Sequence, residues 1–242
     1  MRISLRAVMA LMVFIMAGCS GKEEHLVVGE TDAEFSANTC GRLAYRKQRI
    51  NVREDVTPIL VVYLHGGSSK GDDNELQMKE LAVGVISSYL QDKQISSVFV
   101  VPQCPSTDNW GAKMNEDLSA LIDECGSGCD GVYVLGGSMG GTGTWSLANA
   151  FPSKIRGIMP VAGKPGMASA QNFKSMRVCA VMSEADEVMK TAYVDVKAFC
   201  EKIVAAGGDA ECTIVPASQQ WTHQMTCEQS YTELRLDWLF GK

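Results

Sequence analysis

The segment Gly136-Gly137-Ser138-Met139-Gly140 has the residue types and the spacing of a nucleophilic serine. It follows an apolar run and precedes a helical pattern, so we expect Ser138 on a tight turn between a buried strand and a helix. Glycines two residues before and after Ser138 let the helix cross close to the strand, and the turn directs the serine Oγ out of the sheet. A glycine-rich turn that only packs a helix on a strand has the same pattern, but this placement favours a nucleophile.

A serine hydroxyl needs a neighbouring base before it can act as a nucleophile at neutral pH. The chain has three histidines, His25, His65 and His223. Only His223 follows Ser138, which matches the order nucleophile, acid, base that accompanies a serine of this kind. We therefore predict His223 as the general base, with a histidine on a surface loop as the alternative.

The base needs a carboxylate that orients its ring and stabilises the protonated form. The loop after the predicted strand 178–182 reads SEADEV and offers Glu184, Asp186 and Glu187. We predict Asp186, because it lies a few residues past the strand end, where the chain can turn back towards the histidine. Glu184 and Glu187 remain alternatives.

Hydrolysis through a serine also needs two N–H donors where negative charge develops on the substrate. The Met139 N–H, at the start of the helix after Ser138, is one candidate. The second is expected in the HGGS segment after the early apolar run, and we favour the Gly67 N–H. His65 in the same segment is expected to brace the loop rather than to take part in the chemistry.

The elements that position these residues follow from the periodicity of apolar residues. Apolar, β-branched runs predict buried strands, and apolar residues at helical spacing predict helices between them. This alternation requires crossover connections, so it predicts one domain with a mostly parallel sheet and helices on both faces. Residues 26–57 are expected to add antiparallel edge strands. The predicted strands are 59–64, 98–101, 132–135, 155–161, 178–182 and 212–215, and the predicted helices are 75–90, 114–122, 142–150, 191–206 and 229–240.

Several segments, taken in order, carry a family resemblance: YLHGGSSKGDDNE, VPQCPSTDNWG, GGSMGGTGTW, PVAGKP, and SEADEV with WTH. From about Tyr45 onward the chain resembles the α/β-hydrolase esterases and predicted peptidases related to feruloyl esterases and polyhydroxybutyrate-depolymerase-like enzymes. The resemblance implies an α/β-hydrolase fold and ester hydrolysis at the carboxyl edge of the sheet, without a cofactor. It also implies that Gln103 and Trp110 lie near the substrate pocket and contact the substrate, although Trp110 is equally well explained as core. Substrate identity does not transfer between such relatives.

The charge and the cysteine content of the chain restrict its partners. The net charge is −6 at pH 7, which argues against nucleic acid or anionic lipid as the main partner, since both favour basic surfaces. Eight cysteines follow Cys19, and an even number in an exported chain predicts disulfides, with buried free thiols as the alternative. We expect no metal site, because Cys125 and Cys129 lack a second ligand pair and histidines are few.

The N-terminus combines two arginines, an apolar run over 7–17 and Cys19 after small residues. This pattern is typical of a secretory signal, because the run is too short to cross ~30 Å of hydrocarbon. It resembles a bacterial lipoprotein signal with lipid on Cys19, although Met16 replaces the usual leucine; an ordinary signal with a chance cysteine is the alternative. We expect a lipoprotein of the outer membrane, at its periplasmic face or the cell surface. The predicted divisions are a signal peptide over 1–18, a polar tether over 19–38 and a catalytic domain over 39–242.

Residues 163–177 alone join the strand after the Ser138 helix to the next strand. This connection is too short for a helical cap domain, so we predict no large lid and a site open to bulky substrates. Together with export, it favours a serine esterase acting on acylated oligosaccharides or plant-wall fragments outside the cytoplasm. A serine peptidase of the prolyl-oligopeptidase type, and a non-catalytic binding lipoprotein on a hydrolase scaffold, remain alternatives.

Overall fold

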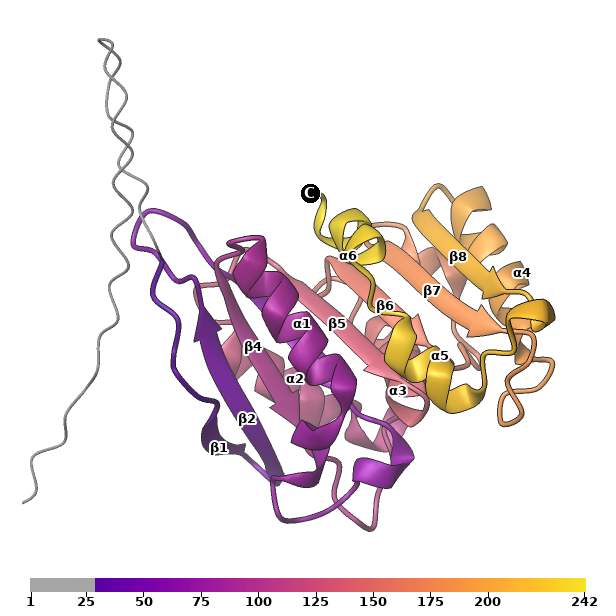
Figure 1. The fold of residues 1–242 in the computed structure, drawn as a ribbon. Helices are drawn as coiled ribbons and strands as arrows, with labels where there is room; N and C mark the ends of the chain where they lie inside the picture. Colours follow the sequence, from indigo (N-terminus) through magenta and orange to yellow (C-terminus); the bar gives the residue numbers. More distant parts are fainter. Residues whose placement is uncertain (1–28) are drawn as a thin grey trace, which may run out of the picture.

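The computed structural model describes residues 29–242, whose sheet and helices are drawn in Figure 1. The predicted signal peptide, the predicted lipid site at Cys19 and the first part of the predicted tether lie outside the described residues. Within residues 29–242, no helix combines the length and the apolar character that crossing a bilayer requires.

A single eight-stranded sheet runs through the described chain. Its strands are β1 (Ser36–Cys40), β2 (Leu43–Ile50), β3 (Ile59–Leu64), β4 (Ser97–Pro102), β5 (Val132–Gly137), β6 (Gly157–Val161), β7 (Arg177–Ser183) and β8 (Asp209–Val215). Their order is β1-β2-β4-β3-β5-β6-β7-β8. β2 pairs antiparallel with β1 and with β4, and all other neighbours are parallel. The predicted mostly parallel sheet with antiparallel edge strands is confirmed.

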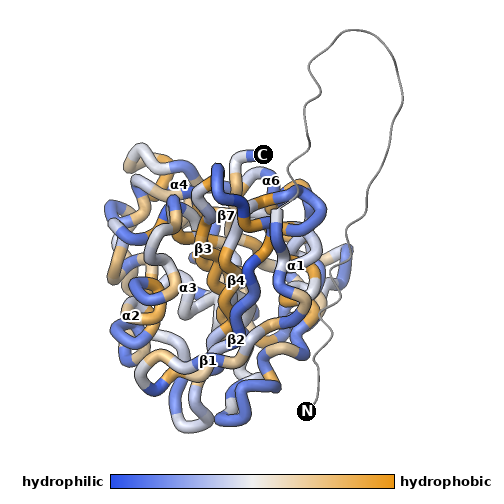
Figure 2. Tube along the Cα trace, turned by 90° about the vertical axis from the view of Figure 1, so that its left-hand side faces the viewer, coloured by the Kyte–Doolittle hydropathy of each residue, from blue (hydrophilic) through white to orange (hydrophobic). Residues whose placement is uncertain are grey.

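The central strands are buried on both faces, as parallel strands between two helical layers must be. Every residue of β5 and β6 is buried. The side chains of β3 alternate between two cores: Leu60 and Val62 belong to one, and Val61 and Tyr63 to the other. Figure 2 shows apolar residues concentrated along the central strands. The carboxyl ends of the parallel strands therefore share one rigid edge, where their loops meet.

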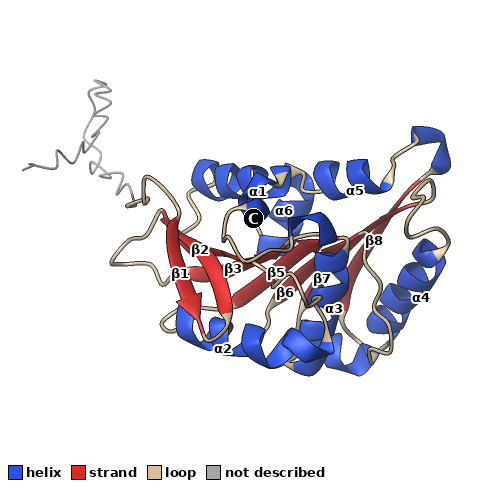
Figure 3. Ribbon diagram, turned by 90° about the horizontal axis from the view of Figure 1, so that it is seen from below, coloured by secondary structure: helices blue, strands red, loops and turns tan. Residues whose placement is uncertain are grey.

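Helices cover both faces of this sheet, as predicted. They are α1 (Leu81–Asp92), α2 (Asn115–Cys125), α3 (Met139–Ala150), α4 (Ala192–Ala205), α5 (His223–Gln229) and α6 (Glu233–Phe240). Figure 3 shows α1, α5 and α6 on one face and α2, α3 and α4 on the other. Trp145 of α3 packs edge-on against Phe173 and Phe199 in one core, and Tyr133 packs against Phe240 in the other.

The domain begins earlier in the chain than predicted. β1 starts at Ser36, and Glu30 already pairs with Val52. Phe35 packs edge-on against Phe99 of β4, with ring centroids 5.7 Å apart. The predicted boundary at residue 38 therefore falls inside β1, because an aromatic contact and a strand ladder attach this segment to the sheet.

Two predicted helices differ from those in the structure. The helix predicted over 75–90 consists of a short 3₁₀ helix, η2 (Leu76–Lys79), and of α1, separated by Glu80 in an extended conformation. The helix predicted over 229–240 is α6 alone, and α5 precedes it as a separate helix. Apolar spacing does not detect these breaks, because the residues on either side keep a helical pattern.

The prediction of disulfides is wrong for this structure, since all eight cysteines of residues 29–242 are free thiols. Cys129, in the CGSGC segment, directs its thiol to the Cys125 carbonyl at 3.8 Å instead of pairing locally. Burial raises the pKa of Cys179 to about 12 and that of Cys104 to about 11. These thiols are therefore protonated and behave as small apolar core residues.

Candidate active site

Ser138 occupies a strained turn between β5 and α3. Its backbone angles are φ 58° and ψ −117°, and a positive φ costs free energy in a residue other than glycine. The flanking glycines allow this turn because a side chain at either position would clash with the backbone. A Cβ on Gly140 would lie 1.8 Å from the Leu64 carbonyl oxygen, and one on Gly136 would lie 2.5 Å from the Gly140 carbonyl oxygen. The steric role predicted for these two glycines is confirmed.

The structure brings the predicted serine, histidine and aspartate together. His223 Nε2 lies 2.7 Å from Ser138 Oγ, and His223 Nδ1 lies 2.8 Å from Asp186 Oδ2. The Asp186 side chain is fully buried, and its Oδ1 accepts the N–H groups of Val188 and Met189 at 2.9 and 2.7 Å. With its position fixed in this way, the carboxylate can accept the Nδ1 proton and leave Nε2 to take a proton from the serine.

The two alternative acids bind backbone groups instead of the imidazole. Glu187 accepts the His223 backbone N–H at 3.0 Å, and Glu184 accepts the Ala217 N–H at 2.9 Å. The hydrogen bond from His223 lowers the pKa of the Glu187 carboxyl. Among the three carboxylates of this loop, Asp186 is the one bonded to the ring.

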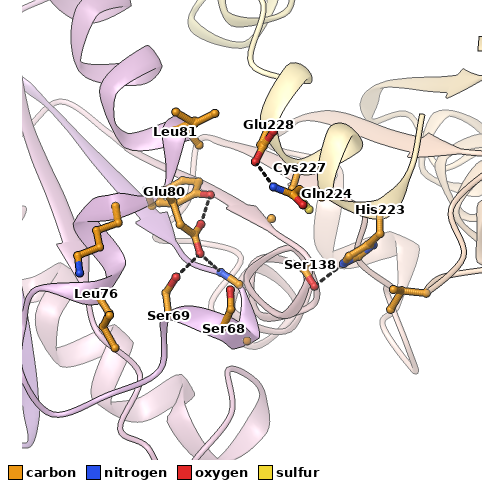
Figure 4. Close-up of a pocket in the computed structure, with 17 residues that line it drawn as sticks. Ser68, Ser69, Leu76, Glu80, Leu81, Ser138, His223, Gln224, Cys227 and Glu228 are labelled. Carbon is orange, nitrogen blue, oxygen red and sulfur yellow. Dashed lines mark hydrogen bonds between the residues drawn. The ribbon is translucent and has the colours of Figure 1, made fainter. Parts of the chain in front are cut away.

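A cavity of about 690 Å³ opens beside Ser138 and His223. Figure 4 shows these two residues on one side, and Glu80, Ser68 and Ser69 on the other. The connection from β6 to β7 contains one short 3₁₀ helix, η4 (Ala170–Phe173), and forms no helical lid over the site. Further lining residues are Leu76, Lys79, Leu81, Val188, Gln224 and Glu228. Within the described residues, no three or more His, Cys, Asp or Glu side chains are grouped to hold a metal ion.

Gly67 and Met139, the predicted oxyanion donors, are each the first residue of a helix. Gly67 begins a short 3₁₀ helix, η1 (Gly67–Ser69), and lines the cavity; Met139 begins α3 directly after Ser138. The first N–H groups of a helix have no partner within it, and neither of these has an acceptor in the described part of the chain. The neighbouring Gly66 N–H, in contrast, donates to Glu80 at 2.8 Å. Both amides are thus free to bind a negatively charged oxygen.

His65 braces the loop before Gly67, as predicted. Its ring is fully buried; Nδ1 lies 2.6 Å from the Gly66 carbonyl oxygen, and Nε2 accepts the Cys104 N–H at 2.9 Å. Burial lowers the pKa of His65, so the ring is neutral, with one nitrogen donating and the other accepting.

The predicted substrate contacts of Gln103 and Trp110 are wrong for this structure. Neither residue lines the cavity beside Ser138, and both are at least 97% buried. Gln103 donates to Asp73 at 2.7 Å and accepts the Asn74 N–H at 2.6 Å, which anchors the segment between η1 and η2. The Trp110 indole N–H donates to the His65 carbonyl at 3.1 Å. Both side chains bond to the loops around the site without lining the cavity.

Sequence reasoning missed two features of the cavity wall, the helix α5 and the side chain of Glu80. α5 has a recognisable signal, because Thr222 before His223 is a favoured N-cap residue, and its side chain accepts the Met225 N–H at 3.2 Å. Glu80 has no such signal. Its hydrogen-bond partners Tyr63, Gly66 and Ser69 precede it by 11 to 17 residues, and no local spacing relates them.

No protein-family model matches the chain, and no curated protein sequence matches it. Among solved structures, a thermostable esterase superposes with a TM-score of 0.72 at 23% identity, covering 86% of this chain and 63% of that one. A feruloyl esterase module from Clostridium thermocellum gives a TM-score of 0.64 at 14% identity, covering 88% of each chain. A candidate dipeptidyl aminopeptidase IV from Bacteroides ovatus gives 0.62 at 13% identity, covering 88% of this chain and 36% of that one.

These likenesses agree with the topology of the sheet. This chain spans less than two thirds of the thermostable esterase, and all three identities lie below 25%. At such identities, shared architecture is established and shared activity is not. The chain has the α/β-hydrolase fold, without a lid domain.

Proposed function

We propose that the protein is a serine hydrolase of carboxylic esters. The observation that carries this proposal is the line of contacts from Ser138 Oγ to His223 Nε2 and from His223 Nδ1 to Asp186. A hydroxyl, an imidazole and a carboxylate in this order turn an inert serine into a nucleophile. The esterases among the similar structures support the same chemistry.

In the proposed cycle, Ser138 Oγ attacks the carbonyl carbon of the ester while His223 Nε2 takes the hydroxyl proton. The amides of Gly67 and Met139 bind the oxygen that becomes negatively charged. When the carbon–oxygen ester bond breaks, His223 gives its proton to the leaving alkoxide and the alcohol departs. A water molecule then attacks the acyl-enzyme by the same route, which releases the carboxylic acid and restores Ser138.

The substrate that we propose is an acylated oligosaccharide or a plant-wall fragment. The short connection between β6 and β7 leaves room for a bulky alcohol, and Lys79, Gln224 and Glu228 on the cavity wall can hydrogen bond to sugar hydroxyls. The similarity to a feruloyl esterase module supports this class. Acetyl-xylan and feruloyl-arabinoxylan should therefore be turned over faster than lipid esters; exclusive activity on lipid esters would rule this substrate class out.

The location that we propose is the outer membrane, through a lipid on Cys19 after cleavage of residues 1–18. The support is the sequence pattern of the N-terminus, with its two arginines, its apolar run and the small residues before Cys19. A Cys19→Ala variant should lose incorporated palmitate and move to the soluble fraction of cells. Unchanged labelling and fractionation would contradict the anchor.

Peptide hydrolysis is the second candidate function. The same three side chains can cleave an amide, and the similarity to a candidate dipeptidyl aminopeptidase IV supports this alternative. Matched ester and anilide substrates with one acyl group distinguish the two activities. Faster cleavage of the ester supports an esterase, and a comparable or faster rate on the anilide supports a peptidase.

Hydrolysis of p-nitrophenyl acetate by the purified protein, beside its Ser138→Ala and His223→Ala variants, tests the proposed chemistry. We expect turnover in the parent and a loss of about 10⁴-fold or more in each variant, because the serine and its base act as one unit. Turnover that survives in Ser138→Ala, or a folded parent protein that hydrolyses no ester, would contradict the proposal.

A further inference from the structure

Glu80 interrupts what the sequence predicts as one continuous helix. It is the N-cap of α1, with φ −70° and ψ 130°, and its side chain makes no capping hydrogen bond. Glutamate is a poor N-cap compared with Ser, Thr, Asp or Asn. Helix formation therefore does not explain this residue, and its side chain lies in the cavity wall opposite Ser138, as Figure 4 shows.

The Glu80 carboxylate binds three groups around the Gly67 amide. Its Oε1 accepts the Gly66 N–H at 2.8 Å and the Ser69 hydroxyl at 2.7 Å, and its Oε2 accepts the Tyr63 hydroxyl at 2.7 Å. Tyr63 lies near the end of β3, and Ser69 ends η1. One side chain thus ties the strand end, the loop and the short helix together on both sides of Gly67.

Glu80 also settles which amide of this loop is available. The Gly66 N–H is occupied by the carboxylate, whereas the Gly67 N–H has no acceptor within residues 29–242. A Cβ built on Gly66 would lie 3.4 Å from Glu80 Oε1 and 3.7 Å from Ser138 Cβ. Glu80 therefore binds the loop at Gly66, the residue that lies next to Ser138.

We infer that Glu80 is a positioning residue that holds the Gly67 amide in place for the transition state. The inference rests on the proposed serine hydrolysis and adds a residue to it. Glu80 takes no proton and touches no reacting atom; it acts through the loop. An amide displaced by about 1 Å can cost ~10²-fold in rate, so this support is expected to affect turnover more than substrate binding.

The charge of Glu80 makes its role testable. A carboxylate that faced a developing oxyanion without donors would repel it, but each Glu80 oxygen accepts at least one hydrogen bond. Burial raises the pKa of Tyr63 far above its usual range, so its hydroxyl remains a donor. In Glu80→Gln, the side-chain oxygen of the glutamine can keep the hydrogen bonds from Gly66 and Ser69. Its side-chain NH2 group can donate to the Tyr63 oxygen. Positioning therefore survives without the charge.

The experiment compares Glu80→Ala with Glu80→Gln in the purified protein. Two rates are measured: hydrolysis of p-nitrophenyl acetate, and inactivation by a fluorophosphonate, whose phosphoryl oxygen must enter the same oxyanion site. We expect Glu80→Ala to lower kcat and the inactivation rate by about 10- to 100-fold with KM within about twofold, and Glu80→Gln to recover both to within about threefold. Glu75→Ala is the matched control, because this exposed acid on the same segment pairs with Arg46 away from the cavity.

Each other outcome overturns the inference. Unchanged rates in a folded Glu80→Ala protein would show that the loop needs no support. Equal losses in both variants would assign the effect to the charge, and a change in KM alone would make Glu80 a substrate contact. If Glu80→Ala does not fold, Ser69→Ala and Tyr63→Phe each remove one donor and should lower the inactivation rate about threefold; unchanged rates in both would contradict the inference. Because fluorophosphonate inactivation needs no ester substrate, it tests the role of Glu80 even if the protein does not hydrolyse esters.

Discussion

The two walls of the cavity beside Ser138 are built in different ways. On one wall, Ser138, His223 and Asp186 form a line of side chains with 2.7 and 2.8 Å contacts. On the opposite wall, the proposed oxyanion donor is the backbone amide of Gly67, and the side chains of His65 and Glu80 bond to the backbone of the neighbouring Gly66.

Substitutions on the two walls should therefore have different effects, on the reaction itself or on the stability of the loops around the site. The side chains of Ser138 and His223 bond to other members of the triad, so removing either one should abolish the reaction and leave the fold in place. A supporting side chain such as Gln103 is buried among backbone groups that it satisfies, so its removal costs stability first.

Asp186→Asn should lower kcat by about 10³- to 10⁴-fold with little change in the free energy of unfolding. The asparagine oxygen can still accept the N–H groups of Val188 and Met189, but its amine cannot accept the proton of His223 Nδ1. Glu184→Gln and Glu187→Gln are the controls, since their partners are backbone amides. A loss in either control as large as in Asp186→Asn would contradict the assignment of the acid.

Gly67→Pro removes one N–H and little else. Gly66 has ψ 174°, which suits a residue before proline; Gly67 is the first residue of η1, where proline is favoured; and a Cβ there meets no atom within 4 Å. We expect kcat to fall by about 10²- to 10³-fold, as for other lost oxyanion donors. Gly67→Ala keeps the N–H and should stay within a few-fold of the parent; equal activity of the two variants would rule out this donor.

Gln103→Ala should reduce the free energy of unfolding by about 1–3 kcal/mol and leave KM nearly unchanged. The substitution leaves the Asn74 N–H without its acceptor and deprives Asp73 of a donor. Chemical denaturation and steady-state kinetics on the same sample measure both effects. A large rise in KM with unchanged unfolding would restore the role in substrate binding that the sequence predicts.

His65 should contribute a small pH dependence to stability. Burial lowers its pKa below 6.5 in the folded protein, while the unfolded chain binds a proton near 6.5. The free energy of unfolding should therefore be constant with respect to this residue above pH 6.5, and fall as the pH drops towards 5. His65→Asn keeps a neutral donor near the Nδ1 position and should show a shallower slope; identical slopes would contradict the prediction.

Much of this site could be predicted from the sequence, for identifiable reasons. Ser138 was predicted from the flanking glycines that its tight turn requires. His223 was predicted because it is the only histidine after the serine, and Asp186 because it lies a few residues past a strand end. The parallel sheet followed from long apolar runs. For Ser138, Asp186 and the strands the constraint acts over a few residues and leaves a local pattern, whereas His223 was identified by its order along the chain.

The rest depends on contacts between segments that are distant in the sequence. Glu80 binds Tyr63, Gly66 and Ser69 at the point where the predicted helix is interrupted, and no local pattern indicates these contacts. Trp110 and Gln103 were expected to contact substrate because the family resemblance places their region near the pocket, but neither side chain lines the cavity. Proximity in the fold does not reveal which face of a loop a side chain occupies.

The most direct test of the central claim is to trap the covalent intermediate. The protein is mixed with p-nitrophenyl acetate, quenched in acid within its first turnovers, digested and analysed by mass spectrometry, with Ser138→Ala treated in parallel. We predict an acetyl group on the peptide that contains Ser138, formed with the first burst of p-nitrophenol and missing from the variant. An acetyl group that forms at another residue, or turnover without any acyl-enzyme, would contradict a serine nucleophile at Ser138.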